Sequence, residues 1–405
     1  MRVLVVHDRY DDALPNGENA VVRWEVDALS AHGIDVRLVE TPRDVLGEPR
    51  WKRGLASLGG IYAPGWRRDV RREIDAFRPD LVHVHNLWPH ATPSVYDACR
   101  DTARPVVQTL HNYRIACIAD FLSRDGQRCE RCLGRRVGWP GLKHRCVEGS
   151  ASASAIKMTA IGVHNLLHTW ERRVDTFIAT TEAMRATFAR AGLPADRIRV
   201  KPSCAPDRGA SDRERRYFCF AGRLSREKGI EALLDGWSTP GLPELRIAGD
   251  GPLAGAVREA ASRHRSVSYV GMLAPDGVSE LMGGAIATII PSAWDEPSPV
   301  VMMQSFCAAT PVIVSDHGHR DESVEHRVTG LVYDAGDRDA LRREIAWATT
   351  HPEACRAMGA TARQRYEERY STEASRARLM EIYAETLAAA GAGVTAPASR
   401  SRHNA

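Results

Sequence analysis

The sequence of 405 residues lacks the features that mark exported, membrane-spanning and nucleic-acid-binding proteins. No apolar run approaches the ~18 residues that a membrane-spanning helix needs. Met1–Val6 leads directly into a strand-like segment, without the basic region, apolar stretch and cleavage site of a signal peptide. The net charge is only +4, which is too small to indicate a nucleic-acid partner. We therefore expect a cytoplasmic protein.

Two common signatures of nucleotide enzymes are absent as well. There is no Walker loop and no GxGxxG motif, which argues against a P-loop NTPase and an ordinary dehydrogenase. No close pair of carboxylates indicates a glycoside hydrolase. Asp337 and Asp339 spell a DxD, the metal-binding signature of a different transferase fold. They directly precede a helical pattern at Ala340 and are expected to start that helix, so no catalytic metal or other cofactor is expected.

What the sequence does contain is two successive series of short apolar segments separated by helical patterns. The strands expected in the first half are Arg2–Val6, Ile34–Val39, Asp80–His85, Pro105–Leu110 and Thr176–Thr180. After a linker rich in Pro, Ser and Asp (Pro202–Glu214), the strands expected in the second half are Tyr217–Ala221, Glu244–Ala248, Val267–Val270, Ala285–Ile290 and Pro311–Ser315. This alternation is typical of parallel sheets covered by helices, so we predict an α/β protein with two Rossmann-like domains.

We place the N-terminal domain at residues 1–201 and the C-terminal domain at residues 202–366. A helix over 367–390 is expected to return to the first domain, and residues 391–405 are expected to form a disordered tail. Ligands of open α/β sheets bind beyond the carboxyl ends of the strands, so polar residues just after the expected strands are the candidate site residues. His85 and His111 stand at such positions, although most histidines at strand ends are structural.

Two segments of the second half have the chemistry of a phosphate site. Arg223 and Lys228 lie five residues apart in the loop that opens a helix, and two cations there suit a diphosphate. Further along, Ser298 and Pro299 open an apolar helix whose first amides can face an anion. Each segment alone has an ordinary alternative: a solvated pair of surface cations in the first case, and a capped core helix in the second.

Taken together and in order, these segments give the chain a resemblance to a known family. The second half contains FAGRLSREKG, AGDGP, VGML, PSAWDEPSPVV, ATPVIVSDHGHRDES and TGLVYDAGD, and the first half contains PNGENAVV, PDLVHVHN and TLHNYR. With these motifs the sequence resembles the retaining GT-B glycosyltransferases of family 4, group 1, which include phosphatidylinositol mannosyltransferases and sucrose synthases. The resemblance implies two facing Rossmann-like domains with a cleft between them, the first for the acceptor and the second for the donor.

The resemblance also implies a reaction. A sugar would pass from a UDP or GDP sugar to a hydroxyl of a glycan, glycolipid or small metabolite, with retention of configuration. The acceptor would attack from the face that the diphosphate leaves, and the leaving phosphate would act as base. Arg223 and Lys228 would hold that diphosphate, Glu296 would face the transferred sugar, and His111 would stand at the reacting centre.

The remaining donor residues follow from the same resemblance. Gly17 would let a loop of the first domain approach the diphosphate, and Gly271 and Met272 would lie along the base. The implied donor site comprises Gly17, Gly222, Arg223, Lys228, Gly271, Met272, Glu296, Ser298, Val300, Val301, Gln304 and Glu322.

Three positions depart from the family pattern. Gln304 stands where a second Glu usually contacts the ribose, and Ala309 and His319 stand where glycines are common. An amide lacks the charge assistance of a carboxylate, which puts donor affinity and nucleotide choice in question. Two alternatives therefore stay open. One is a non-catalytic nucleotide-sugar-binding partner of another transferase, and the other is a nucleotide-sugar 2-epimerase, which should show more carboxylates at the sugar site.

Four of the nine cysteines gather in a glycine-rich insertion at 117–146, namely Cys117, Cys129, Cys132 and Cys146. Four thiolates around a CxxC suit a tetrahedral zinc ion, which would be structural because four sulfur ligands leave no open position. The alternative is four free thiols, or a redox pair at Cys129 and Cys132. Some of the resembling transferases carry a similar Cys-bearing insertion.

A basic and aromatic stretch precedes the insertion. Residues 50–72 interleave seven Lys and Arg with Trp51, Tyr62 and Trp66. Such a run could dock on anionic lipid headgroups, which would give the protein a peripheral contact with the inner face of the membrane. It could equally form a solvated helix face beside the acceptor cleft, and this second interpretation is favoured.

Overall fold

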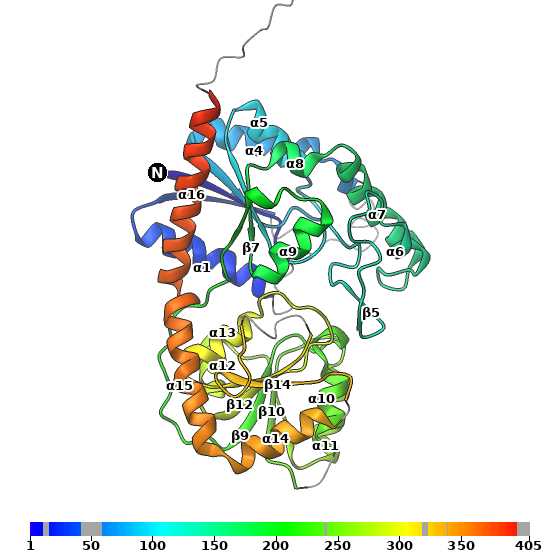
Figure 1. Cartoon of the computed structure of the whole chain (residues 1–405), viewed down its shortest axis with the longest axis vertical. Helices are drawn as coiled ribbons and strands as arrows, with labels where there is room; N and C mark the ends of the chain where they lie inside the picture. The colour runs from blue at the N-terminus through cyan, green and yellow to red at the C-terminus, as the bar shows by residue number, and fades with distance from the viewer. Residues whose placement is uncertain (11–15, 42–58, 239–240, 318–322, 338, 395–405) are drawn as a thin grey trace, which may run out of the picture.

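Two parallel six-stranded sheets, each flanked by helices, form the two halves of an elongated molecule (Figure 1). The computed structural model describes residues 1–10, 16–41, 59–238, 241–317, 323–337 and 339–394. The architecture confirms the prediction of an α/β protein with two Rossmann-like domains. Each sheet has its own apolar core, so the two halves fold around separate centres.

The first sheet has the strand order β2-β1-β3-β4-β7-β8, and every pair in it is parallel. Its strands are β1 (Arg2–His7), β2 (Asp35–Glu40), β3 (Leu81–Val84), β4 (Val106–Leu110), β7 (Thr176–Ala179) and β8 (Ile198–Val200). The central strands are buried on both faces, as their continuous apolar runs require: Leu4, Val82 and Val107 are 0% exposed. The short strand β8 is not among the strands that the sequence predicts.

Helix α16 (Thr372–Val394) returns to pack on this sheet. Seven further helices accompany the sheet within the described residues, together with a short 3₁₀ turn at Gly59–Ile61 and another at Ala195–Arg197. They are α1 (Gly17–Ala31), α4 (Pro64–Phe77), α5 (Ser94–Asp101), α6 (Trp139–Lys143), α7 (Ala151–Leu166), α8 (Thr169–Arg173) and α9 (Glu182–Ala191). Helix α1 begins where the side chain of Asn16 accepts hydrogen bonds from the amides of Glu18 and Asn19, at 2.9 and 3.2 Å. This cap fixes the end of α1 that faces the second domain.

The second sheet repeats the pattern with the order β11-β10-β9-β12-β13-β14. Its strands are β9 (Tyr217–Ala221), β10 (Leu245–Ala248), β11 (Val267–Gly271), β12 (Ala285–Ile290), β13 (Val312–Ser315) and β14 (Gly330–Tyr333). Its helices are α10 (Ile230–Gly236), α11 (Ala254–Arg263), α12 (Pro275–Gly283), α13 (Val300–Cys307) and α14 (Ala340–Thr350), the last of which starts directly after Asp339. The edge strand β14 belongs to the TGLVYDAGD motif but is not predicted as a strand from the sequence.

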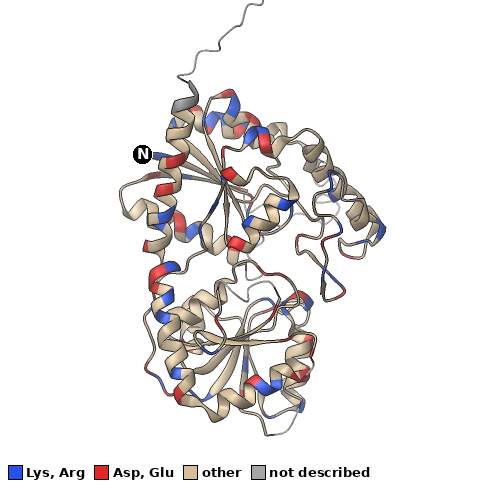
Figure 2. Ribbon diagram, viewed as in Figure 1, with Lys and Arg blue, Asp and Glu red and all other residues tan. Residues whose placement is uncertain are grey.

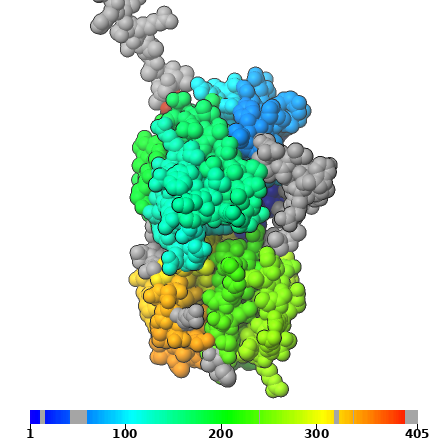
Figure 3. Space-filling view, turned by 90° about the vertical axis from the view of Figure 1, so that its right-hand side faces the viewer, coloured from blue at the N-terminus to red at the C-terminus, as the bar shows by residue number. Residues whose placement is uncertain are grey.

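The insertion between β4 and α7 stands out from the first domain. It contains the antiparallel pair β5 (Ser123–Arg124) and β6 (Gln127–Arg128), followed by loop and by α6. Viewed from the side, this segment extends down to the boundary with the second domain (Figure 3). It therefore lies at the boundary between the two domains.

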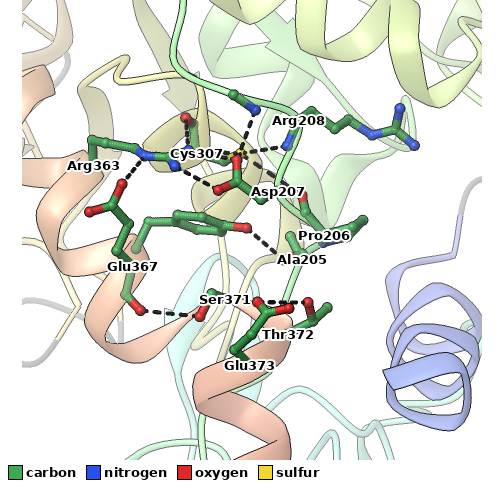
Figure 4. Close-up of polar contacts among 12 residues, drawn as sticks. Ala205, Pro206, Asp207, Arg208, Cys307, Arg363, Glu367, Ser371, Thr372 and Glu373 are labelled. Carbon is green, nitrogen blue, oxygen red and sulfur yellow. Dashed lines mark hydrogen bonds and ion pairs between the residues drawn. The ribbon is translucent and has the colours of Figure 1, made fainter. Parts of the chain in front are cut away.

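The chain crosses between the domains twice, and the two crossings lie side by side (Figure 4). The amide of Ala205 donates to the carbonyl of Tyr370 at 3.0 Å, and the hydroxyl of Tyr366 donates to the carbonyl of Ala205 at 2.9 Å. Nearby, the Arg363 guanidinium donates to the carboxylate of Asp207 at 2.6 Å. The segment predicted as a linker is thus held against the second crossing.

The C-terminal region differs from the single helix predicted over 367–390. Helix α15 (Pro352–Arg369) ends at Tyr370, and α16 (Thr372–Val394) begins after Ser371, whose hydroxyl accepts from the amide of Ala374 at 3.2 Å. The break occurs where the chain passes from the second domain to the first, because a capping Ser starts a new helix there. Helix α16 includes residues 391–394, which the sequence assigns to the tail; residues 395–405 lie outside the described part.

Charged residues of both signs are interspersed over both domains (Figure 2). On α4 the basic side chains have acidic neighbours: Arg67 lies 2.6 Å from Asp101, and Arg68 and Arg72 lie 3.3 and 3.5 Å from Asp69. The first part of the basic stretch, 50–58, lies outside the described residues. Among the described helices, none has both the length and the apolar character that crossing a bilayer requires.

Candidate active site

The carboxyl ends of the second sheet are closed by loops whose backbones touch. A Cβ atom on Gly249 would lie 1.8 Å from the carbonyl oxygen of Gly222, and one on Gly229 would lie 1.7 Å from that of Pro291. Both glycines have positive φ, 131° and 73°, which other residues rarely adopt. The loops after β9, β10 and β12 are therefore packed together as bare backbone, and this brings Arg223, Lys228 and the segment after Pro291 to one place.

Lys228 and Glu296 meet at this place. The Lys228 ammonium group forms an ion pair with the Glu296 carboxylate, whose other oxygen accepts from the Ser292 hydroxyl at 2.6 Å. Glu296 is only 8% exposed, so its charge is held in position by these partners. Arg223 is more open: its side chain is 36% exposed and lies 3.8 Å from Glu227. The site thus offers one cation next to a buried carboxylate and a second cation facing solvent.

Helix α13 presents its N-terminus beside this pair. Pro299 is the residue before the helix, and the amides of Val300 and Val301 donate no hydrogen bond to any residue that the structure describes. Free amides at a helix start attract anions. Ser298 precedes this turn, and Gln304 lies on the next turn, half-buried, with its side chain making no hydrogen bond to a described residue.

Helix α1 of the first domain lies close to the N-terminus of α13. A Cβ atom placed on Gly17 would lie 3.0 Å from Cγ2 of Val300, closer than nearly all real contacts. Gly17 and Val300 begin α1 and α13, so the starts of two helices from different domains converge. The approach expected for Gly17 is to the donor diphosphate, whereas the contact seen is with Val300, where an added methyl would require the neighbour to shift.

Two of the expected donor residues lie farther along the sheet. Gly271 ends the edge strand β11 with φ of 74°, and its carbonyl accepts from the Gly249 amide at 2.8 Å. The next residue, Met272, is 50% exposed. β11 is separated from β9 by β10, so this pair forms the outer end of the row of loops. Glu322 and His319 lie outside the described residues.

On the first domain, His111 lines a pocket at the carboxyl end of β4. The pocket also includes His85, Asn86, Trp88, Arg114 and Glu18. Because Glu18 follows Gly17, this pocket adjoins the convergence of α1 and α13.

His111 is held by a second histidine. Nε2 of His111 lies 2.9 Å from Nδ1 of His85, and the two rings are stacked with centroids 5.2 Å apart. Burial lowers the pKa of both rings well below the usual value, with neighbouring His83 and Lys201 adding to the effect, so both are neutral. His85 is predicted as a candidate site residue or a structural histidine at a strand end. In the structure it contacts His111 directly.

The proton between these rings can be placed from a third group. Oε2 of Glu25 is buried, lies 4.0 Å from Nε2 of His85, and has no hydrogen-bond partner among the described residues. The carboxylate favours a proton on Nε2 of His85, which makes Nδ1 of His85 an acceptor. His111 then donates from Nε2 and keeps its Nδ1 as an acceptor for a ligand.

Glu25, His83 and His85 also form a compact group, with ligand atoms within 4.8 Å of one another. Both ring nitrogens of His83 are already engaged, by the Tyr383 hydroxyl at 2.7 Å and the Thr109 hydroxyl at 2.8 Å. The Lys201 ammonium group lies 2.6 Å from Glu25 and would repel a cation. The group is therefore a hydrogen-bonded core and not a metal site.

The opposite wall of the pocket contains a charged network that the sequence does not single out. Arg114 donates to the Tyr10 hydroxyl at 2.8 Å and lies 3.4 Å from Asp120. Burial raises the pKa of Glu18 to about 7, although the Arg114 charge opposes this shift. Arg114 and Glu18 lie inside the motifs TLHNYR and PNGENAVV, which is the only sequence signal that could have identified them.

The Cys-bearing insertion contacts the loop that follows β12 in the second domain. The rings of Phe121 and Trp294 lie 4.8 Å apart in a T-shaped arrangement, and Arg128 pairs with Asp295 at 3.0 Å. The indole N–H of Trp294 is buried and has no acceptor among the described residues. Cys117, Cys129, Cys132 and Cys146 line one common cavity of the insertion.

Comparison with known proteins assigns this arrangement to a family. Residues 205–365 match the family "Glycosyl transferases group 1", and residues 15–204 match "Glycosyltransferase Family 4". The chain is 30% identical over 193 residues to the alpha-maltose-1-phosphate synthase of Mycolicibacterium smegmatis, covering 44% of this chain and 50% of that protein. It is 33% identical over 271 residues to an uncharacterized glycosyltransferase of Methanocaldococcus jannaschii, covering 62% and 61%. The alignments thus span half to about three fifths of these relatives' lengths.

Among solved structures, HepE of Anabaena in complex with UDP-glucose superposes with a TM-score of 0.65 at 17% identity, over 96% of this chain and all of that one. At this identity the likeness concerns the fold, and it confirms the two-domain GT-B arrangement. The two family matches adjoin at residues 204 and 205 and together run from 15 to 365. The chain belongs to the group 1 glycosyltransferases of family 4.

Proposed function

We propose that this protein is a retaining glycosyltransferase that moves a sugar from a UDP or GDP sugar to a hydroxyl of an acceptor. The observation that carries the proposal is the approach of Gly17 to Val300, so close that a Cβ atom on Gly17 would lie 3.0 Å from the Val300 side chain. It supports a donor site formed by the first amides of α13 and the Lys228–Glu296 pair, with the His111 pocket on the other domain for the acceptor. The UDP-glucose complex of the structurally similar HepE supports a nucleotide-sugar donor.

The phosphate end of the donor fits the charges of the second domain. Two phosphates need cations and amide donors, which Arg223, Lys228 and the first amides of α13 supply. Glu296 would remain beside Lys228 and accept hydrogen bonds from sugar hydroxyls. The leaving diphosphate gains charge as the glycosidic bond breaks, so these groups stabilise the transition state more than the bound donor.

The reaction then proceeds on one face of the sugar. The bond from the anomeric carbon to the diphosphate oxygen breaks, and the acceptor oxygen bonds to that carbon from the same side. The acceptor proton passes to the leaving phosphate oxygen, which serves as the base. Neutral His111, with Nδ1 as an acceptor, would orient the acceptor hydroxyl without itself needing to take the proton.

Donor binding can be measured before any acceptor is known. The melting temperature should rise selectively with one class among UDP-, GDP-, ADP- and dTDP-sugars, because a ligand at a hundred times its Kd adds about 2.7 kcal/mol. Arg223→Ala and Lys228→Ala should lose the shift. Arg226→Ala is the matched control, since Arg226 lies on the same loop with its side chain 83% exposed and paired with Glu231.

Stereochemistry can be tested on the slow hydrolysis of that donor. A retaining enzyme first releases the hexose with the anomeric configuration of the donor, which proton NMR detects before mutarotation. Release of the opposite anomer would refute retention. Donor binding without turnover in the presence of varied glycan and lipid acceptors would instead favour the non-catalytic partner, and formation of a second nucleotide sugar would favour the epimerase.

For the basic helix α4 we propose a solvated surface rather than a membrane contact. Arg67, Arg68, Arg71 and Arg72 each lie within 4 Å of an acidic side chain, which reduces the positive potential that anionic lipid requires. Sedimentation with phosphatidylserine vesicles should therefore leave the protein in the supernatant at physiological salt.

A further inference from the structure

The four cysteines of the insertion meet although they come from separate turns. Cys117 lies in the loop between β4 and β5, Cys129 and Cys132 follow β6, and Cys146 follows α6. All four line one cavity, together with Ile118, Pro140, Gly141 and His144. The other five cysteines of the chain line no part of this cavity and are buried elsewhere. A chance gathering of free thiols does not account for four side chains that converge from three turns.

The backbone is built closely around one of these sulfurs. A Cβ atom on Gly138 or Gly141 would lie 3.7 or 3.6 Å from Sγ of Cys132, and only 2.9 or 2.5 Å from Ile118. The two glycines therefore allow the chain to wrap the cluster.

We propose that Cys117, Cys129, Cys132 and Cys146 bind one zinc ion. Zinc–sulfur bonds of about 2.3 Å in a tetrahedron separate the sulfurs by about 3.8 Å. No three of these four sulfurs lie within 4.8 Å of one another, so binding would draw them inward by rotation of the cysteine side chains. The four thiols release their protons to solvent as the four bonds to zinc form.

The zinc ion is structural in this proposal. Four sulfur ligands leave no position for substrate, and the insertion has little apolar core of its own: within it, two-residue strands and a five-residue helix are the regular elements described. The cluster supplies the cross-link that such a segment otherwise lacks. Oxidation of Cys129 and Cys132 to a disulfide would consume two of the ligands, so the redox interpretation and the zinc interpretation exclude each other.

The position of the insertion gives the ion a consequence for the active site, and this step rests on the proposed function. Asp120, three residues after Cys117, pairs with Arg114 of the acceptor pocket and with Lys157 at 2.7 Å. On its other side, Phe121 and Arg128 contact Trp294 and Asp295, directly before Glu296. Zinc would thus hold together the segment that touches both the acceptor pocket and the donor loop.

The test begins with the metal alone, on the purified full-length chain. After dialysis against metal-free buffer, elemental analysis should give about one zinc per chain. Replacement by Co²⁺ should give the absorption of tetrahedral thiolate-bound cobalt. Cys129→Ser and Cys132→Ser should lose both signals, whereas Cys355→Ser, which alters a buried thiol of the second domain, should keep them. A wild-type chain without zinc and without the cobalt spectrum would overturn the proposal.

A second measurement does not depend on the variants folding. Alkylation followed by mass spectrometry should label Cys117, Cys129, Cys132 and Cys146 only after a chelator removes the metal. A Cys129–Cys132 disulfide in the freshly purified protein, or equal labelling with and without chelator, would contradict zinc binding.

The zinc site and the proposed donor site can be refuted independently of each other. Arg223→Ala should abolish donor binding while the zinc content stays at one per chain. Removal of zinc should reduce donor turnover at least tenfold. If zinc is present and its removal leaves donor binding and turnover unchanged, the site exists but the link to the donor loop is refuted.

Discussion

The ring of His83 in β3 and the hydroxyl of Tyr383 in α16 are hydrogen bonded at 2.7 Å, although 300 residues separate them in the chain. Tyr383 is 0% exposed and belongs to a core formed with Leu379, Ile382 and the apolar face of β1. The last helix is therefore part of the first domain, and the contact specifies how it docks. Its consequences can be measured.

Tyr383→Phe should lower the free energy of unfolding by about 1–3 kcal/mol, because a buried ring nitrogen loses its partner while the shape is kept. Urea denaturation at pH 7.5 measures this. Tyr62→Phe is the control: Tyr62 is exposed, its hydroxyl lies 3.0 Å from Asp97, and its loss should cost less than about 0.5 kcal/mol. Equal effects in the two variants would show that the buried bond contributes nothing.

The buried histidines make stability fall in mild acid. Burial lowers the pKa of His83 to about 3 from its ordinary 6.5, so the unfolded chain binds the proton and the folded chain does not. The groups that face this ring, Lys201 among them, do not relieve the effect. Stability from this source is complete above pH 6.5 and is lost as the pH falls toward 3.

This loss should approach about 1.4 kcal/mol per pH unit for each such histidine. Unfolding free energies at pH 7.5, 6.5 and 5.5 give the slope. The buried Glu18 carboxyl, with its pKa raised to about 7, also titrates in this range, so the comparison with His83→Gln isolates the contribution of His83. In His83→Gln the slope of unfolding free energy against pH should be smaller by up to about 1.4 kcal/mol per pH unit, which is the contribution of one proton. An unchanged slope in that variant would mean that His83 does not titrate differently in the two states.

Gly17→Ala should weaken donor binding without weakening the fold. The added methyl would meet Val300 at 3.0 Å and push α1 away from α13, so we expect about a tenfold higher donor Kd, which corresponds to about 1.4 kcal/mol. Val300→Ala in the same chain should restore most of the affinity. Gly65→Ala is the control, because a methyl there meets nothing within 4 Å. A Gly17→Ala variant with unchanged Kd would show that the helix approach plays no part in donor binding.

Gln304 can be tested by restoring the family's carboxylate. If its side chain faces the ribose, Gln304→Glu should tighten donor binding about fivefold, since a charge-assisted hydrogen bond adds about 1 kcal/mol. Gln304→Met, which keeps the length and removes the hydrogen bonds, should weaken it. Isothermal titration with the preferred donor measures both. If neither change affects affinity, Gln304 does not contact the donor.

The sequence predicts the arrangement of the main strands because each is a short, continuous apolar run followed by polar residues. It also predicts that Lys228 and Glu296 come to one edge, since the carboxyl ends of parallel strands share that edge. The edge strands β8 and β14 are missed because they span only three and four residues, too few for a pattern to distinguish a strand from a loop.

Side-chain pairs between distant segments could not be predicted. The bond from His85 to His111 and the approach of Gly17 to Val300 depend on how loops of separate elements meet in space. The break between α15 and α16 is equally hidden, because residues 367–390 read as one helical pattern and only the passage between domains favours a cap at Ser371. A local sequence pattern does not indicate which distant residues come into contact in the fold.

The paired crossings at Ala205 and Tyr370 limit how the domains can move. Because the two interdomain connections are hydrogen bonded to each other at Ala205 and Tyr370, the domains can move relative to one another mainly by rotation about this point. The insertion lies on the opposite side of the molecule from these crossings (Figure 1). Any rotation about the crossings would separate Phe121 from Trp294, so the insertion is the part of the first domain that holds the second domain on the side away from the crossings.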